Sequence, residues 1–579
     1  MVVARRAKAV LAFALWAALF TVICTQSPLY RFTQNTYFLH GVAAAGTAPL
    51  QGDYLVSTAD PTPVFSVLVE LTVRYLRPEF FYAWSALLFG VYLLSAIGIA
   101  QRIFGSHGTP VLTLIFITCF LAVHSIVLRA LSQRLCGIDL PYLLHQGLAH
   151  QWTVSPKLAP CAFGVLFIAA VSAWMQDRPL SAALWMAAAA TFHPTYVLTA
   201  AILSVAFMAD AVRAPGGVRR SLGFGAGVFL LILPIATYVA LHFRPAPEPW
   251  HSLAQRTLVE EVIPHHTLLR TWDPKTTTIQ LVAVAFGLLL SRRTRLFPLL
   301  AISTGLAFAV SLVALLTEAK TLLLSFPWRI SVVLVPLSTI ASLATSLRYA
   351  ARRWEEELER HAQAIRILCF LSLTGLGIGG IAKMTVERRE LAEEPDRGII
   401  AFARQARRAG QVYLVPVGTS LLMPTVMRDF RLNAGVPIFV DMQTHPYRDD
   451  EFLEWLRRVR LAEDVYFGST ETRLKALRSA LEAAGVTHVV WETMKRNEFP
   501  LRATELYRDR QFVVLRISPP PPAVLAQNAV DQALADAHAR FGAPETAGER
   551  EQVIAVARVD AHGFAGLERR LRTADEHVW

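Results

Sequence analysis

Two aspartates in residues 26–79, called the first loop, have the side chains that proton transfer requires. Asp53 follows Gly52, which allows close backbone approach, and Asp60 begins the run Asp60-Pro-Thr-Pro-Val-Phe65. A residue before proline is biased to extended backbone, so we expect both carboxylates on a structured loop. A carboxylate there could act as a general base, with its pKa raised by apolar surroundings. The alternative is local: Asp53 as a turn residue and Asp60 as a helix cap.

A second group of polar residues lies in residues 244–276, called the second loop. It contains Arg256, His265, His266 and Arg270, and a proline precedes the two histidines. Arginine offers a fork of N–H donors that matches phosphate oxygens, so this group could bind a phosphate or another part of a substrate. The histidines could instead contribute to a metal site. The alternative is a solvated loop at the membrane surface.

Three more ionisable residues fall within or at the edge of apolar segments: His124, His193 and Arg329. Charge inside a membrane is costly and normally faces a cavity or a partner. Arg329 could extend its guanidinium to the membrane surface or bind a lipid phosphate. His193 precedes a proline, and it could line a gap between two helices or lie hydrogen-bonded in the core.

Further along the chain, the segments 430–435 and 440–447 resemble loops at strand ends. Ligands of α/β sheets bind at such loops, although ordinary surface structure is the simpler interpretation. The five cysteines have no metal-ligand spacing, and no Walker A, dinucleotide-binding or HExxH motif occurs. ATP-driven transport and zinc-protease chemistry are therefore disfavoured.

The composition indicates which elements must position these residues. The chain has 579 residues, of which 54% are hydrophobic and only 17% charged, and its mean hydropathy is +0.40. Soluble proteins are about 45–50% apolar and about 25% charged, and single cores stop growing near roughly 250–300 residues. We therefore predict a polytopic α-helical membrane protein. Much of the net charge of +12 lies beside apolar segments, and no nucleic-acid-binding motif occurs, so nucleic acid is not an expected partner.

Eleven apolar segments reach spanning or near-spanning length. The first segment ends near residue 24. The other ten lie near 80–104, 109–130, 156–176, 180–192, 194–213, 221–243, 277–291, 296–316, 321–347 and 364–382. The segment 62–76 is apolar but charged at two positions, and it is interpreted as a re-entrant or interfacial helix. Basic residues gather at 177–179, 214–220, 292–295 and 348–363, so the positive-inside rule predicts a cytoplasmic N-terminus and places both loops outside.

After residue 382 charged residues become frequent. Apolar runs at 411–417, 437–440, 487–491 and 511–517 predict strands, and segments near 397–408, 449–459 and 471–484 predict helices. This order indicates a small α/β domain over 383–518, with a largely parallel sheet. An odd number of spans places this domain outside the cytoplasm. The Pro/Ala-rich tail at 519–579 is expected to be weakly ordered.

Over residues 1–518 this layout resembles the GT-C superfamily of polyprenyl-phosphate-dependent glycosyltransferases. The similar features are a cytoplasmic N-terminus, a long first loop with Asp53 and Asp60, about eleven spans and an outer α/β domain. The runs Asp60-Pro-Thr-Pro-Val-Phe65, Ile263-Pro-His-His266 and Phe430-Arg-Leu-Asn-Ala-Gly435 also resemble a bacterial branch of membrane proteins with this layout.

The resemblance implies a multi-pass protein of a bacterial inner membrane that moves a sugar from a polyprenyl phosphate to an acceptor at the outer face. In that superfamily an acidic residue of the first outer loop, often one of an adjacent pair, activates the acceptor or holds a divalent cation. That role would fall here to Asp53 or Asp60, which stand seven residues apart. The phosphate would be bound by Arg256, His265, His266, Arg270 or Arg329.

A second hypothesis is a non-enzymatic lipid or solute transporter, a flippase or an envelope-assembly scaffold. It draws on the absence of an adjacent acidic pair and on the polar residues His124 and His193 within apolar segments. Transporters often contain inverted repeats of their spans, and no internal repeat is detected here, which favours the enzyme.

Overall fold

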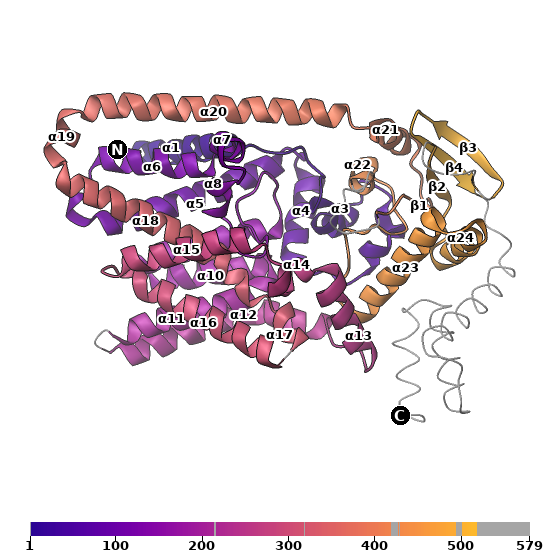
Figure 1. Ribbon diagram of the computed structural model, residues 1–579, viewed down its shortest axis with the longest axis horizontal. Coiled ribbons are helices and arrows are strands. Elements are labelled where there is room, and N and C mark those ends of the chain that lie inside the picture. Colours follow the sequence, from indigo (N-terminus) through magenta and orange to yellow (C-terminus); the bar gives the residue numbers. More distant parts are fainter. Residues whose placement is uncertain are drawn as a thin grey trace.

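The computed structural model describes residues 2–213, 216–317, 319–418, 427, 429–493, 499 and 501–517. The tail predicted at 519–579 lies outside these residues. Long apolar helices run side by side through the left and centre of the molecule, and a small α/β region adjoins their right-hand ends (Figure 1).

The apolar helices establish a multi-pass membrane protein. Among the described residues, eight helical segments are long and apolar enough to cross a membrane, or nine if α6 and α7, bent by 60°, form one span. The helices are α1 (Val2–Cys24), α5 (Phe80–Phe104), α6 (Pro110–His124), α7 (Ile126–Cys136), α9 (Val165–Met175), α10 (Pro179–Phe192), α11 (Val197–Val212), α12 (Gly217–His242), α15 (Pro274–Ser291), α16 (Leu296–Thr317), α18 (Ser331–Arg353) and α20 (Ala362–Ala392).

Two of the eleven predicted spans are short helices, so the number eleven stays a prediction. The segment 156–176 forms a 3-10 turn, η4 (Pro160–Gly164), followed by α9, and the segment 180–192 forms α10. Every residue of α9 is buried. A helix enclosed by protein satisfies its ends against neighbouring segments and does not need the length of a lipid-facing span.

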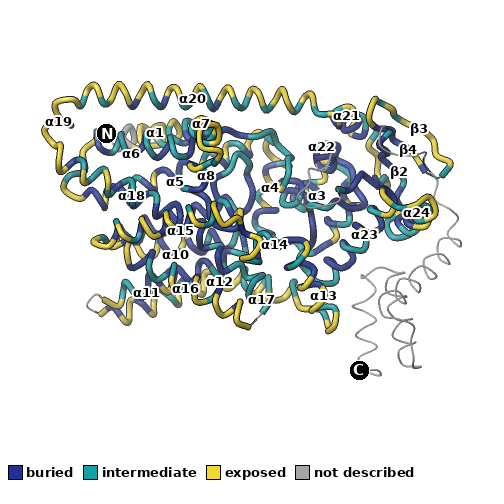
Figure 2. Tube along the Cα trace, in the orientation of Figure 1, coloured by how far each residue is buried: buried dark blue, intermediate teal, exposed yellow. Residues whose placement is uncertain are grey.

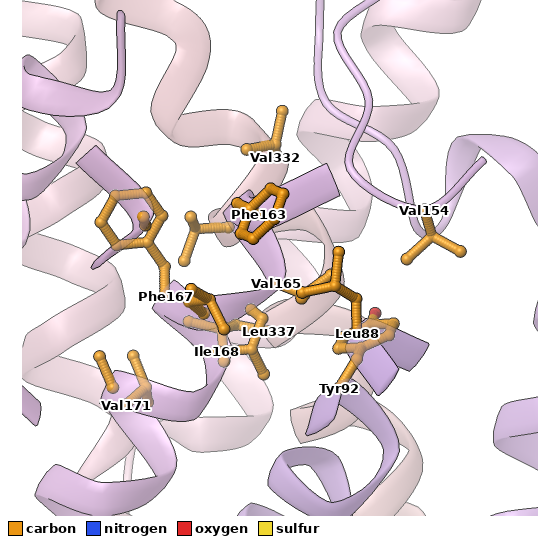
Figure 3. Close-up of a cluster of buried hydrophobic side chains, with 14 of the residues drawn as sticks. Leu88, Tyr92, Val154, Phe163, Val165, Phe167, Ile168, Val171, Val332 and Leu337 are labelled. Atoms are coloured by element: carbon orange, nitrogen blue, oxygen red, sulfur yellow. The ribbon is translucent and has the colours of Figure 1, made fainter. Parts of the chain in front are cut away.

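The hydrophobic core of the membrane part is centred on α9, which packs between α5, α10 and α18. Figure 3 shows Val165 of α9 beside Leu88 and Tyr92 of α5, and Ile168 of α9 beside Leu337 of α18, all within one hydrophobic cluster. By contrast, α20 crosses one side of the molecule with much of its length exposed (Figure 2). Its exposed side chains are mostly apolar, as expected for a surface that faces lipid.

Short helices lie between the membrane helices and the α/β region. The predicted helix at 62–76 is α4, which packs on α3 and α10, and Glu70 pairs with Arg74 at 2.8 Å on its surface. The short helices are α2 (Gln34–Tyr37), α3 (Leu39–Ala45), α4 (Pro63–Tyr75), α13 (Trp250–Thr257), α14 (Pro264–Thr267) and α17 (Lys320–Leu324). Two others lie elsewhere: α8 (Leu140–Leu143) packs against α6 and α7, and α19 (Glu355–Arg360) joins α18 to α20 at the opposite end.

The C-terminal α/β region contains a four-stranded sheet in the order β1-β2-β4-β3. Its helices pack around this sheet and include all three predicted ones. The elements are α21 (Arg397–Ala406), β1 (Tyr413–Leu414), α22 (Phe430–Ala434), α23 (Asp449–Phe467), α24 (Thr470–Ala484), β2 (His488–Glu492), β3 (Ala503–Arg508) and β4 (Phe512–Ile517).

The prediction of a largely parallel sheet is wrong. Only β1 and β2 pair in parallel, whereas β4 is antiparallel to both β2 and β3. β3 was not predicted because its residues are polar and almost all exposed. This strand therefore lacks the apolar alternation of a half-buried strand. The predicted strand at 437–440 is reduced to one bridge, between Tyr413 and Ile438.

Candidate functional site

The first loop, the second loop and the α/β region meet on one face of the membrane part. Tyr54 of the first loop donates a hydrogen bond to the carbonyl oxygen of Glu451 at 2.6 Å. The backbone N–H of Ala246, in the second loop, donates to Asp449 at 2.9 Å. Both acceptors belong to the first turn of α23, so this helix end is where the three segments come together.

Asp53 is buried at this junction and joins the first loop to the α/β region. Its Oδ2 accepts hydrogen bonds from Nε of Arg431 at 2.8 Å and from the N–H of Ile438 at 3.0 Å, while Oδ1 accepts from the N–H of Leu55. Arg431 also pairs with Asp441 at 3.0 Å. Burial raises the pKa of Asp53, and the Arg431 guanidinium opposes that rise. This geometry favours a structural role for Asp53.

Asp60 has different surroundings. It is half-buried, its Oδ1 accepts from the N–H of Thr62 at 2.8 Å, and its carbonyl oxygen accepts from the hydroxyl of Tyr238. Because α4 begins at Pro63, Asp60 caps the turn before the helix rather than the helix itself. Its other carboxylate oxygen accepts no hydrogen bond from the described part of the chain, so that oxygen can accept a proton from a substrate.

A second carboxylate lies beside Asp60 that the sequence analysis did not select. Both carboxylate oxygens of Glu451 accept from the N–H of Ala59, at 3.0 and 3.1 Å, and Arg448 lies 3.4 Å away. Burial is the main cause that raises the pKa of Glu451 to about 7. The only sequence signal is the acidic run 449–451, which is also typical of an ordinary helix start.

Arg329 is the centre of a second cluster. It lies in the 3-10 turn η8 (Pro327–Ile330), and its Nη1 is 2.8 Å from Nε2 of His193. The guanidinium also lies over the rings of Tyr196 and Phe326, at 5.7 and 5.1 Å from their centroids. Its Nε is buried without a hydrogen-bond partner, and no carboxylate of the described residues forms an ion pair with Arg329. A half-buried cation without a carboxylate counter-ion attracts negative charge.

Hydroxyl and imidazole groups surround Arg329. The hydroxyls of Tyr37 and Tyr447 lie 3.4 Å apart, and the Tyr37 ring is 6.2 Å from that of His193. His266 donates through Nδ1 to the carbonyl oxygen of Ala149 at 2.7 Å. Burial lowers the pKa of His266 to about 3, so its imidazole is neutral and leaves Nε2 as an acceptor.

Three of the seven non-glycine residues with positive φ in the described part of the chain lie at this cluster. Phe326, Ala149 and His150 all have positive φ values, of 52°, 57° and 56°. A non-glycine residue in this region costs about 1–3 kcal/mol, and such residues gather at functional sites. Phe326 immediately precedes the turn that carries Arg329, so the strain is located where the side chains converge.

The two clusters belong to one site. Tyr447, beside Arg329, and Glu451, beside Asp60, are separated by only four residues. Four residues of fully extended chain span at most about 14 Å. The segment from Tyr447 to Glu451 therefore connects the two clusters over a short length of chain.

The structure does not bring every selected residue to this site. Arg256 is exposed and pairs with Glu260 at 3.2 Å, and Arg270 is exposed on a separate turn. His265 stacks near His266, with ring centroids 4.2 Å apart. His124 is a buried core residue within the membrane part, bonded to the carbonyl oxygen of Phe120. Among the described residues, no group of three or more His, Cys, Asp or Glu could hold a metal ion.

The chain is a multi-pass membrane protein whose C-terminal α/β region contacts the first and second loops. A family model described as a Domain of unknown function (DUF6798) matches residues 395–462. The matched stretch includes Arg431, Asp441, Tyr447 and Glu451. No curated protein matches the chain.

Proposed function

We propose that the protein is a GT-C-like membrane glycosyltransferase that moves a sugar from a polyprenyl-class lipid phosphate to an acceptor hydroxyl. The observation that supports this proposal most is that Arg329 is a cation without a carboxylate partner among the described residues, while Asp60, at the junction of three segments, keeps a free carboxylate oxygen. Arginine matches phosphate oxygens, and burial strengthens its attraction for charge.

In the proposed reaction the acceptor oxygen bonds to the anomeric carbon of the sugar as the bond from that carbon to the phosphate oxygen breaks. The free oxygen of Asp60 takes the hydroxyl proton as general base. The leaving lipid phosphate keeps the electron pair of the broken bond, and Arg329 stabilises that negative charge. Asp53 positions the first loop through Arg431 rather than contacting the substrate.

We further propose that the site faces the outside of a bacterial inner membrane. The connections 177–179, 292–295 and 348–363 lie at the ends of the helices opposite the α/β region (Figure 1). They contain eight arginines, and basic residues near span ends are retained in the cytoplasm. The acceptor would then be a component of the cell envelope.

A transfer assay tests this function. The full chain in lipid nanodiscs is incubated with a panel of isotope-labelled isoprenyl-phosphate sugars and a cell-envelope fraction as acceptor. We expect Arg329→Gln and Asp60→Asn each to reduce transfer by about 10²–10³-fold, the size expected for removing a charge-stabilising donor or a general base. Arg270→Gln, which removes an exposed arginine outside the cluster, should leave transfer unchanged.

Full transfer by both Asp60→Asn and Arg329→Gln would refute the mechanism. A liposome assay separates the alternative class of function. Movement of a lipid phosphate between leaflets, without transfer of the sugar, would identify a transporter or flippase instead.

A further inference from the structure

An apolar groove with a volume of about 420 Å³ opens between α15 and α16, beside η8. Phe308 and Leu312 of α16 line it and are 49% and 56% exposed, so the groove is open to the bilayer. Its wall also includes Leu148, Trp272, Leu281 and Trp328. A concave apolar surface of this volume is large enough for a ligand of drug-like size.

Two buried donors in the wall lack partners. Trp272 and Trp328 are each 8% exposed, and their rings meet edge to face at 6.0 Å. Neither indole N–H has an acceptor within the described chain. An indole N–H can only donate, and leaving it buried and unpaired is unfavourable. The groove therefore fits an apolar molecule that also brings an oxygen acceptor to this depth.

Two residues that line the groove are direct chain neighbours of residues in the Arg329 cluster. Trp328 directly precedes Arg329, and Leu148 directly precedes Ala149, whose carbonyl oxygen accepts from His266. The groove therefore lies beside the backbone of the turn that carries Arg329, a cation without a carboxylate partner among the described residues. A lipid without a phosphate would fill the groove but leave Arg329 unpaired.

We infer that this groove holds the hydrocarbon chain of a single-chain lipid phosphate whose phosphate binds Arg329, an inference that rests on the proposed function. The chain enters sideways from the bilayer between α15 and α16. The two indole N–H groups donate to the single ester oxygen that joins the chain to phosphorus, and Arg329 binds the terminal oxygens of the phosphate.

Photo-crosslinking tests the inference directly. The full-length protein in phosphatidylcholine nanodiscs is labelled with geranylgeranyl phosphate that carries a diazirine at the chain end, and the crosslinked peptides are mapped. We expect label on α15 and α16. Geranylgeraniol with the same diazirine, and the Arg329→Gln variant with the phosphate probe, should each give at least 10-fold less label.

A substitution that fills the groove can be compared with a matched substitution on another helix. Ser311 lines the groove and Thr374 faces outward on α20, and each hydroxyl donates to the carbonyl oxygen four residues earlier in its own helix. Ser311→Phe should reduce labelling at least 10-fold, whereas Thr374→Phe should not change it. If Ser311→Phe does not fold, Thr277→Phe fills the same groove from α15.

The outcomes separate the groove from the proposed function. Phosphate-dependent labelling that requires Arg329 but maps to other helices would overturn the groove and leave the proposed function standing. Labelling that Ser311→Phe and Thr277→Phe do not reduce would overturn the groove as well. Equal labelling by the alcohol and the phosphate, unaffected by Arg329→Gln, would overturn both.

Discussion

Glu451 accepts its backbone hydrogen bonds from Ala59, the residue that precedes Asp60, so α23 contacts the first loop beside Asp60. Glu451 shares the single N–H of Ala59 between its two oxygens and is 8% exposed, whereas Asp60 retains a free oxygen. The raised pKa of Glu451 means that the folded protein holds its proton more tightly than the unfolded chain does. The contact between the first loop and α23 is therefore sensitive to pH.

The sign of this sensitivity follows from the shift. Because the folded-state pKa of Glu451, about 7, lies above its ordinary value of 4.5, protonation favours the folded state. Its contribution is fully present below about pH 4.5 and is lost as the pH rises through 7. We expect the unfolding temperature in detergent to fall between pH 5.5 and pH 8, with a smaller fall in Glu451→Gln.

Asp450→Asn is the matched control for Glu451→Gln, because Asp450 lies on the same helix turn and pairs with the same Arg448. That variant should keep most of the pH dependence of the parent, because the Asp450 charge is the smallest of the named causes that shift the pKa of Glu451 and burial is the largest. If Glu451→Gln unfolds with the same pH dependence as the parent protein, the carboxyl group does not titrate in this range.

Individual site residues were predictable to different degrees. Arg329 and His266 could be selected because a charge at the edge of an apolar segment and a histidine after proline are visible locally. The partners could not be selected in the same way. Asp53 bonds to Arg431, 378 residues away, and that contact depends on how the whole chain folds back. Sequence spacing carries no such information.

At the scale of elements, α15 and α18 approach closely because Gly287 has no side chain. A Cβ at this position would lie 2.3 Å from Cβ of Ser338 and 2.6 Å from its Cα. Small residues allow such backbone contact between membrane helices, which associate through packing rather than through exclusion of water. This contact fixes α15, one wall of the groove, against α18, the helix that follows Arg329.

Gly287→Ala should therefore destabilise the protein, by about 1–3 kcal/mol, the usual cost of overpacking. Gly305→Ala on α16 is the control, since a Cβ there would meet nothing within 4 Å. It should be neutral or slightly stabilising because alanine favours helix more than glycine does. Thermal unfolding of both variants in the same detergent gives the comparison. Equal unfolding temperatures for both would contradict the proposed close packing.

Elements were more predictable than their pairing. Apolar runs and amphipathic periodicity located the long helices and α21, α23 and α24, because burial in lipid or against a sheet imposes a pattern on the chain. The pattern of β3 is different, since an exposed edge strand needs no buried face. Because β3 was not predicted, the sheet was expected to be largely parallel, whereas it is mixed.

The whole molecule places its N-terminus and its α/β region at opposite ends (Figure 1). An odd number of crossings is required for that arrangement. Nine spans, with α6 and α7 counted as one, satisfy this condition, and counting the short helices α9 and α10 as a further pair leaves the number odd. The predicted parity therefore does not depend on whether these two helices cross completely.

Parity and charge together make the orientation testable. Arg295, between α15 and α16, pairs with Asp177, between α9 and α10, and with Asp210, in the last turn of α11. These helix ends therefore lie together at one end of the bundle. With the remaining arginines of that end kept inside, we expect the α/β region outside the cytoplasm. Alkaline phosphatase fused after residue 518 should be active, and a fluorescent protein fused there should be dark. Fusions at residue 294 should give the reverse. A fluorescent, phosphatase-negative fusion at 518 would place the Arg329 site in the cytoplasm and exclude a donor that enters from the outer leaflet.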